Sequence, residues 1–120
     1  INETGLCVWR SGQRPELEMK TDGGLLRGRM ALRWSGKQHS TPGVVNQSRD
    51  YDAIERAGRT AREAVWAGSF DGLANAVRQS YAVQRAEQMD PLPGDPAAPD
   101  AALAACRPVA WKYCGGGFGG

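Results

Sequence analysis

Three observations on the sequence predict an α+β fold in which a mainly antiparallel sheet carries helices on one face. Apolar and polar residues alternate in the N-terminal third of the chain, as in half-buried strands. From about residue 49 the apolar spacing changes to the three- and four-residue steps of an amphipathic helix. Strand character returns at 109–114, directly before a run of glycines. The expected order is β-β-β-α-α-α-β in a single domain, residues 1–120.

Three strands are expected before the first helix. The first two form a hairpin across a Ser-Gly-Gln turn and stop at a Thr-Asp-Gly-Gly sequence. The third covers 25–36, where Met30, Leu32 and Trp34 alternate with other residues in the period-2 pattern of a strand. A polar loop containing Pro-Gly follows, because proline cannot continue regular pairing.

Three helices are expected after this loop. The first begins near Arg49 and ends at Gly68, since glycine readily adopts the left-handed conformation that follows a last helical turn. Ser69 caps the second helix, which covers 70–89, and a connection this short makes the two helices antiparallel. A proline-rich segment separates them from a short third helix at 101–107.

Composition and charge exclude several function classes. The hydrophobic fraction of 41% and the charged fraction of 23% are ordinary for a globular domain. A net charge of +2 is too small to indicate nucleic acid or an anionic membrane as the main partner. No apolar run approaches the ~20 residues that cross a bilayer, and the N-terminus lacks the pattern of an export signal.

The chain has three cysteines, Cys7, Cys106 and Cys114. They are far apart and have no histidine or second cysteine at the spacing of a zinc site, so neither a metal nor a disulfide framework is expected. Reduced thiols are the ordinary state of such cysteines in a cytoplasm, which makes a cytoplasmic location the expectation.

The sequence ends in Cys-Gly-Gly-Gly-Phe-Gly-Gly, directly after the last expected strand. The residues alone leave two interpretations open. Glycine loses more backbone entropy than any other residue on folding, which favours a flexible tail. Glycines also let backbone N–H groups converge on an anion where a Cβ would not fit, which favours a phosphate-binding loop.

This C-terminal stretch, WKYCGGGFGG, resembles the third conserved motif of the GHMP kinases, the family of galactokinase, homoserine kinase, mevalonate kinase and phosphomevalonate kinase. The motif has the form Lys-x-Ser/Thr-Gly-Ala-Gly-x-Gly-Gly. Lys112 matches the lysine, Cys114 the Ser/Thr and Gly116 the alanine. The matching glycines are Gly115, Gly117, Gly119 and Gly120. Cysteine is a weaker hydrogen-bond donor than the usual hydroxyl, which puts phosphate binding through this side chain in doubt.

The loop after the expected third strand carries a second resemblance. Its sequence, SGKQHSTPGVV, is similar to the Thr-Gly-Lys-x-x-Ser-x-x-Val loop of the branch that phosphorylates heptose phosphate and fucose. Ser35, Gly36, Lys37 and Ser40 or Thr41 take those places. The resemblance implies an acceptor-side loop in which Lys37, His39 and Ser40 meet a sugar hydroxyl or phosphate. Without the resemblance, His39 is a lone histidine in a solvated loop.

The resemblance covers nearly the whole chain and implies the ferredoxin-like C-terminal domain of a kinase. Such an enzyme transfers the γ-phosphate of ATP, with Mg²⁺, to a sugar or sugar phosphate. The ATP loop of the family, Pro-x-x-x-Gly-Leu-Gly-Ser-Ser-Ala, and its catalytic aspartate have no counterpart here. We therefore expect a C-terminal fragment that has no catalytic residue, is inactive by itself, and has an N-terminal kinase domain as its partner. In the family a further strand follows the third motif, and the sequence stops before it.

A stand-alone, non-catalytic binding or assembly module with the same fold is the second hypothesis. Trp9, Trp34 and Trp111 all fall on expected strands, and helices on one face leave the other face of the sheet to be covered. A protein partner would supply that cover. An open sheet edge would also allow two chains to pair as a homodimer.

Overall fold

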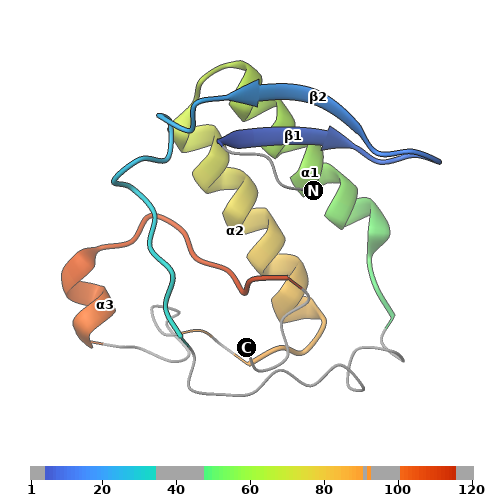
Figure 1. Ribbon diagram of the computed structural model, residues 1–120. Helices are drawn as coiled ribbons and strands as arrows, with labels where there is room; N and C mark the ends of the chain where they lie inside the picture. Colours follow the sequence, from blue (N-terminus) through green and yellow to red (C-terminus); the bar gives the residue numbers. More distant parts are fainter. Residues whose placement is uncertain (1–4, 35–47, 91, 93–100, 116–120) are drawn as a thin grey trace.

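A computed structural model describes residues 5–34, 48–90, 92 and 101–115, and it shows an α+β arrangement (Figure 1). The elements are β1 (Leu6–Arg10), β2 (Glu16–Thr21), α1 (Tyr51–Trp66), α2 (Phe70–Ala86) and α3 (Ala101–Cys106). The predicted hairpin and the three predicted helices are therefore confirmed, with α2 ending three residues before its expected limit. Within the described residues, none of the helices is long and apolar enough to cross a membrane.

Strands β1 and β2 form a two-stranded antiparallel sheet that crosses the helical pair (Figure 1). Leu6 pairs with Thr21, and the register shifts by one residue after Val8. Gly5 directly precedes β1 and has a φ of +95°, a backbone conformation that favours glycine. A Cβ on this glycine would lie 2.2 Å from the carbonyl oxygen of Thr21, so only glycine fits there.

Helices α1 and α2 form an antiparallel hairpin whose ends are set by local capping. Asp50 accepts a hydrogen bond from the Ala53 N–H at 2.8 Å and so caps α1. Gly68 takes the predicted left-handed conformation, with a φ of +62°. Ser69 then caps α2 by accepting from the Gly72 N–H at 3.0 Å. Both residues expected at this junction are confirmed in their roles.

Small side chains make up most of the helical interface. A Cβ added to Gly72 would come within 2.8 Å of the Ala64 Cβ, which shows how closely the two helices approach. The buried hydrophobic residues among those described are Ala57, Ala64, Val65, Ala74, Ala76, Tyr81 and Met89. Alanine and glycine therefore allow close packing, and the larger Tyr81 and Met89 fill the end of α2 that meets the C-terminal segment.

The prediction of a third strand at 25–36 is wrong for residues 25–34, the part of that range that the structure describes. Residues 24–29 form a turn, in which the Leu26 N–H donates to Gly23 O at 3.0 Å and the Arg29 N–H donates to Leu26 O at 3.0 Å. Residues 30–34 belong to no strand. An alternating pattern becomes a strand only when another strand satisfies its backbone groups, and among the described residues only β1 and β2 pair.

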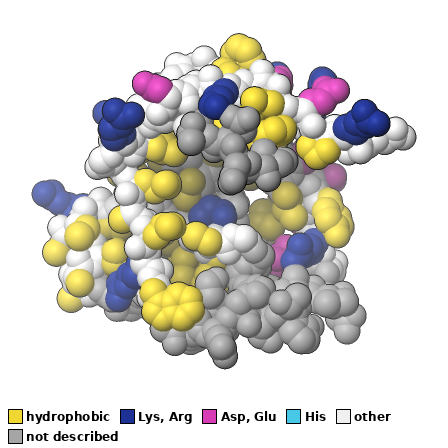
Figure 2. All heavy atoms as spheres, in the orientation of Figure 1, with side chains coloured by type: hydrophobic (Ala, Val, Ile, Leu, Met, Phe, Trp, Pro, Cys, Tyr) yellow, Lys and Arg dark blue, Asp and Glu magenta, His cyan; other side chains and the backbone are white. Residues whose placement is uncertain are grey.

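The apolar side chains of this segment consequently face solvent. Met30 is 67% exposed, Leu32 81% and Trp34 72%. The space-filling view shows hydrophobic side chains at many points of the visible face, around a central hollow (Figure 2). The expectation that Trp34 lies on a strand is wrong, whereas Trp9 does lie on β1.

The predicted last strand, 109–114, is also absent as a strand. The backbone of this segment bonds to side chains of α2 instead. Arg78 Nη1 donates to Val109 O at 2.8 Å, and the carboxamide of Gln84 binds the backbone of Tyr113. Trp111 packs edge-on against Tyr81, with 6.2 Å between the ring centroids. The segment is thus fixed on α2, and no strand of the described residues pairs with it.

Candidate functional site

The structure describes three of the ten residues expected in a functional site. Lys112, Cys114 and Gly115 lie in the segment that packs on α2. Lys37, His39, Ser40, Gly116, Gly117, Gly119 and Gly120 lie outside the described residues. The part of the site that can be built from the structure is therefore the stem of the glycine run and its surroundings.

A groove of about 560 Å³ extends over α1 and α2 and includes Lys112 and Gly115 in its lining. Helix α1 contributes Ile54, Ala57, Gly58 and Ala61, and α2 contributes Leu73, Ala76, Val77, Ser80, Val83 and Gln84. Arg49, Glu87 and Met89 complete the lining. Most of these side chains are apolar, whereas the charged ones come from the ends of the helices and the C-terminal segment. Such a combination suits a ligand with a hydrocarbon part and a charged group.

Two cations and one carboxylate line this groove. Arg49 Nε lies 3.8 Å from Glu87 Oε1, which is ion-pair distance but too long for a hydrogen bond. Glu87 is the residue that caps the C-terminal end of α2, and its side chain is only 7% exposed. Lys112 Nζ donates to Tyr113 O at 2.6 Å and keeps two further N–H donors. The described charged residues of the lining, two cations and one carboxylate, therefore favour an anionic group.

Gln84 fixes the backbone that leads into the glycine run. Its Oε1 accepts from the Tyr113 N–H at 3.0 Å, and its Nε2 donates to Tyr113 O at 3.2 Å and to Gly115 O at 3.4 Å. This role of Gln84 was not expected from the sequence. The available signal was a glutamine on the apolar stripe of α2, three residues after the buried Tyr81.

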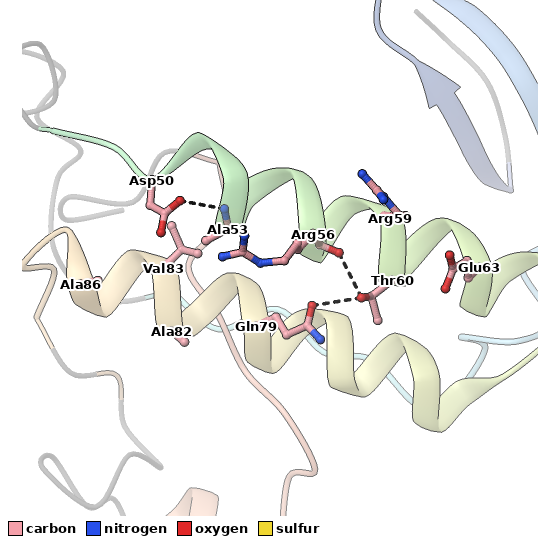
Figure 3. Close-up of a pocket in the computed structure, with 10 residues that line it drawn as sticks. All are labelled: Asp50, Ala53, Arg56, Arg59, Thr60, Glu63, Gln79, Ala82, Val83 and Ala86. Carbon is pink, nitrogen blue, oxygen red and sulfur yellow. Dashed lines mark hydrogen bonds between the residues drawn. The ribbon is translucent and has the colours of Figure 1, made fainter.

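Another groove, of about 610 Å³, lies between the helices and is drawn in Figure 3. Thr60 Oγ1 donates to Gln79 Oε1 at 3.1 Å and to Arg56 O at 3.0 Å, which joins α1 to α2 at this point. Arg56 and Arg59 are exposed at its border. Of the three motif residues that the structure describes, Lys112, Cys114 and Gly115, none contributes to its lining, although Val83 borders both grooves.

The described cysteines are all free thiols. Cys114 and Cys106 are exposed, and Cys7 is half-buried on β1. Over the described ranges, no group of three or more His, Cys, Asp or Glu side chains could hold a metal ion. Among the residues that the structure describes, Glu87 is the carboxylate that lines the groove next to Lys112 and Gly115.

Comparison with known proteins does not assign the chain to a family. No family model matches the sequence, and neither a curated protein nor a solved structure matches it. What is known of the site therefore comes from its own residues and their geometry.

Proposed function

We propose that the chain is the C-terminal domain of an ATP-dependent small-molecule kinase that phosphorylates a sugar or sugar phosphate. The observation that carries the proposal is that Lys112 and Gly115, two residues of the glycine motif, line one groove together with Arg49. A loop that positions a phosphorylated ligand requires a cation and closely approaching backbone N–H groups. Lys112 and the first glycine of the run, Gly115, bring both to the same groove.

The chemistry assigned to these residues is positional. Phosphoryl transfer is accelerated mainly by alignment of the reacting groups and by stabilisation of charge on the transferred phosphoryl group. Lys112 would donate to a phosphate oxygen through its free N–H groups, and the glycine run would supply backbone N–H donors. Bound ATP, with Mg²⁺, supplies the phosphoryl group. Glu87 is the one carboxylate that the described residues contribute to the groove, and a Mg²⁺ ion in proteins is usually held by one or two carboxylates together with substrate phosphates, so we propose that an N-terminal kinase domain supplies the metal site.

Acceptor-dependent turnover tests the proposal directly. The protein at its native length is incubated with ATP and Mg²⁺ and with a panel of hexoses, heptoses and their phosphates. ADP release and the ³¹P NMR spectrum of the product are then measured. We expect ADP release that depends on one acceptor class, and no turnover from the 120-residue chain alone. A folded native-length protein that releases no ADP with any acceptor would show that the proposal is wrong.

Replacement of Lys112 by alanine tests the role of the groove. One lost charge-assisted hydrogen bond should raise the KM for the phosphorylated ligand by about tenfold or more. Arg59→Ala is the matched control, because Arg59 is a cation at the other groove and pairs with Glu55 at 2.5 Å. The proposal requires that the control variant keep the parent KM.

A second candidate function is a non-catalytic assembly module, which is favoured by the exposure of Met30, Leu32 and Trp34. The intact mass of the protein from its native source separates the two candidates. A mass well above 12.9 kDa supports the kinase, because the additional chain can hold the ATP-binding domain. A mass of 12.9 kDa, together with a larger size by light scattering in solution, supports the module.

A further inference from the structure

The carboxamide of Gln84 forms hydrogen bonds with the backbone just before the glycine run, as the backbone of a neighbouring strand would. A strand neighbour accepts from a backbone N–H and donates to a backbone C=O, and Gln84 does both at one residue, Tyr113. A further contact from the same Nε2 reaches Gly115 O at 3.4 Å. Gln84 is itself 6% exposed, so these bonds form where water does not compete freely for them.

The same carbonyl connects Gln84 with Lys112. Tyr113 O accepts from Gln84 Nε2 at 3.2 Å and from Lys112 Nζ at 2.6 Å. The direction of the Tyr113 carbonyl therefore depends on Gln84, and the position of the Lys112 ammonium depends on that carbonyl. Gly115, at a φ of +57°, then turns the chain in a conformation that favours glycine.

We propose that Gln84 is a positioning residue for the segment that leads into the glycine run, and that it sets the orientation of Lys112 and Gly115 toward the groove. This inference rests on the proposed kinase function, because it assigns Gln84 to the alignment of a phosphorylated ligand. Gln84 also lines the groove, but in this role its carboxamide bonds to the backbone of Tyr113 and Gly115. It acts through Tyr113, and its contribution is the alignment of two groups that do touch the ligand.

Gln84→Met tests the inference, since methionine keeps the length of the side chain and removes the donor and the acceptor. Gln79→Met is the matched control, because Gln79 lies on the same helix and its carboxamide binds Thr60 rather than the C-terminal segment. Gln84→Glu is a second variant, which keeps the acceptor for the Tyr113 N–H and loses both donated bonds.

Two measurements are made on each variant. Amide hydrogen exchange in the 120-residue chain reports on Tyr113, with the amide of buried Ala76 as the reference for an intact helical hairpin. Steady-state kinetics on the native-length protein give kcat and the KM values for ATP and for the acceptor. A loss of folded protein lowers the apparent kcat and leaves KM unchanged, so a change in KM separates alignment from stability.

We expect Gln84→Met to lose protection at Tyr113 on the order of tenfold while Ala76 stays protected, and to lower kcat/KM by roughly ten- to a hundredfold with a raised KM. Gln84→Glu should retain more of the protection at Tyr113 but lose a similar part of kcat/KM. Gln79→Met should change neither quantity.

Unchanged kinetics in Gln84→Met would overturn the inference, and so would a fall in kcat alone that matches the loss of folded protein. If the parent protein has no kinase activity with any acceptor, the proposed function fails first. The inference then fails with it, and the exchange data leave Gln84 with a structural role only. A kinase-active parent with a kinetically silent Gln84→Met variant contradicts the inference and leaves the proposed function intact.

Discussion

Arg62 of α1 binds the carboxylate of Glu18 on β2 through both oxygens, with Nε 3.0 Å from Oε1 and 3.0 Å from Oε2. The Nη2 group of Arg62 also bonds to Oε1. The two residues are 44 positions apart, so this pair joins the hairpin to the helices. The hydrogen bonds from Arg62 lower the pKa of Glu18, and those same bonds raise the pKa of Arg62.

The Glu18–Arg62 pair makes stability depend on pH. Because the folded-state pKa of Glu18 is lowered, the pair stabilises the protein fully above the unfolded pKa of about 4.5. That contribution is lost as the pH falls from this value through the folded pKa. Urea unfolding of the parent and of Glu18→Gln, at pH 7 and at several values below pH 4.5, should show a difference at pH 7 that shrinks as the pH falls.

Glu16→Gln is the control for this prediction. Glu16 pairs with Arg10 inside the β-hairpin, and both side chains are more than 60% exposed. This variant should change stability little at any pH, since exposed ion pairs contribute about 0–1 kcal/mol. An equal loss in both variants at pH 7 would contradict the assignment of the pH dependence to Glu18.

Two helical glycines should respond to alanine in opposite directions. A Cβ at Gly72 would lie 2.8 Å from the Ala64 Cβ, so Gly72→Ala should separate the helices and cost about 1–3 kcal/mol. Nothing lies within 4 Å of a Cβ at Gly58, so Gly58→Ala should stabilise the protein by about 0.5–1 kcal/mol. Thermal unfolding of both variants provides the measurement. A gain in stability for Gly72→Ala would contradict the close helical packing.

The cap at Ser69 should contribute measurably to stability. Its Oγ accepts from the Gly72 N–H at 3.0 Å, and Ser69→Ala leaves that donor without this partner. The expected cost is about 1 kcal/mol in the free energy of unfolding by urea. Ser80→Ala, in the interior of α2, is the control and should stay within about 0.5 kcal/mol of the parent. Equal effects of the two substitutions would exclude a specific capping role.

The four tryptophans should differ in their access to solvent. Trp34 is 72% exposed and Trp66 56%, whereas the Nε1 atom of Trp111 is buried. Acrylamide quenching of the fluorescence should therefore weaken clearly in Trp34→Phe and hardly in Trp111→Phe. The opposite order would show that residues 30–34 are covered in solution, by another part of the chain or by a second molecule.

The helices and their ends could be predicted from the sequence because each signal is local. Apolar spacing selects the buried face of a helix, and caps such as Ser69 act on an N–H three residues away. The hairpin of β1 and β2 was predictable for the same reason, since its strands are joined by a short turn. The residues of the glycine motif were also visible in the sequence, although only Lys112, Cys114 and Gly115 can be placed.

Whether the segments around Leu32 and Trp111 form strands could not be decided from their own local sequence. Alternation gives a segment the pattern of a strand, but a strand also needs a partner for its backbone groups, and that partner is distant in sequence. Residues 30–34 have no strand partner among the described residues, and the backbone of Tyr113 bonds to a side chain 29 positions away. The amino-acid sequence by itself thus determined the hairpin, the helices and the cap at Ser69. Only the tertiary structure decided that Gln84 anchors the C-terminal motif, because the contact exists only once α2 and the C-terminal segment pack together.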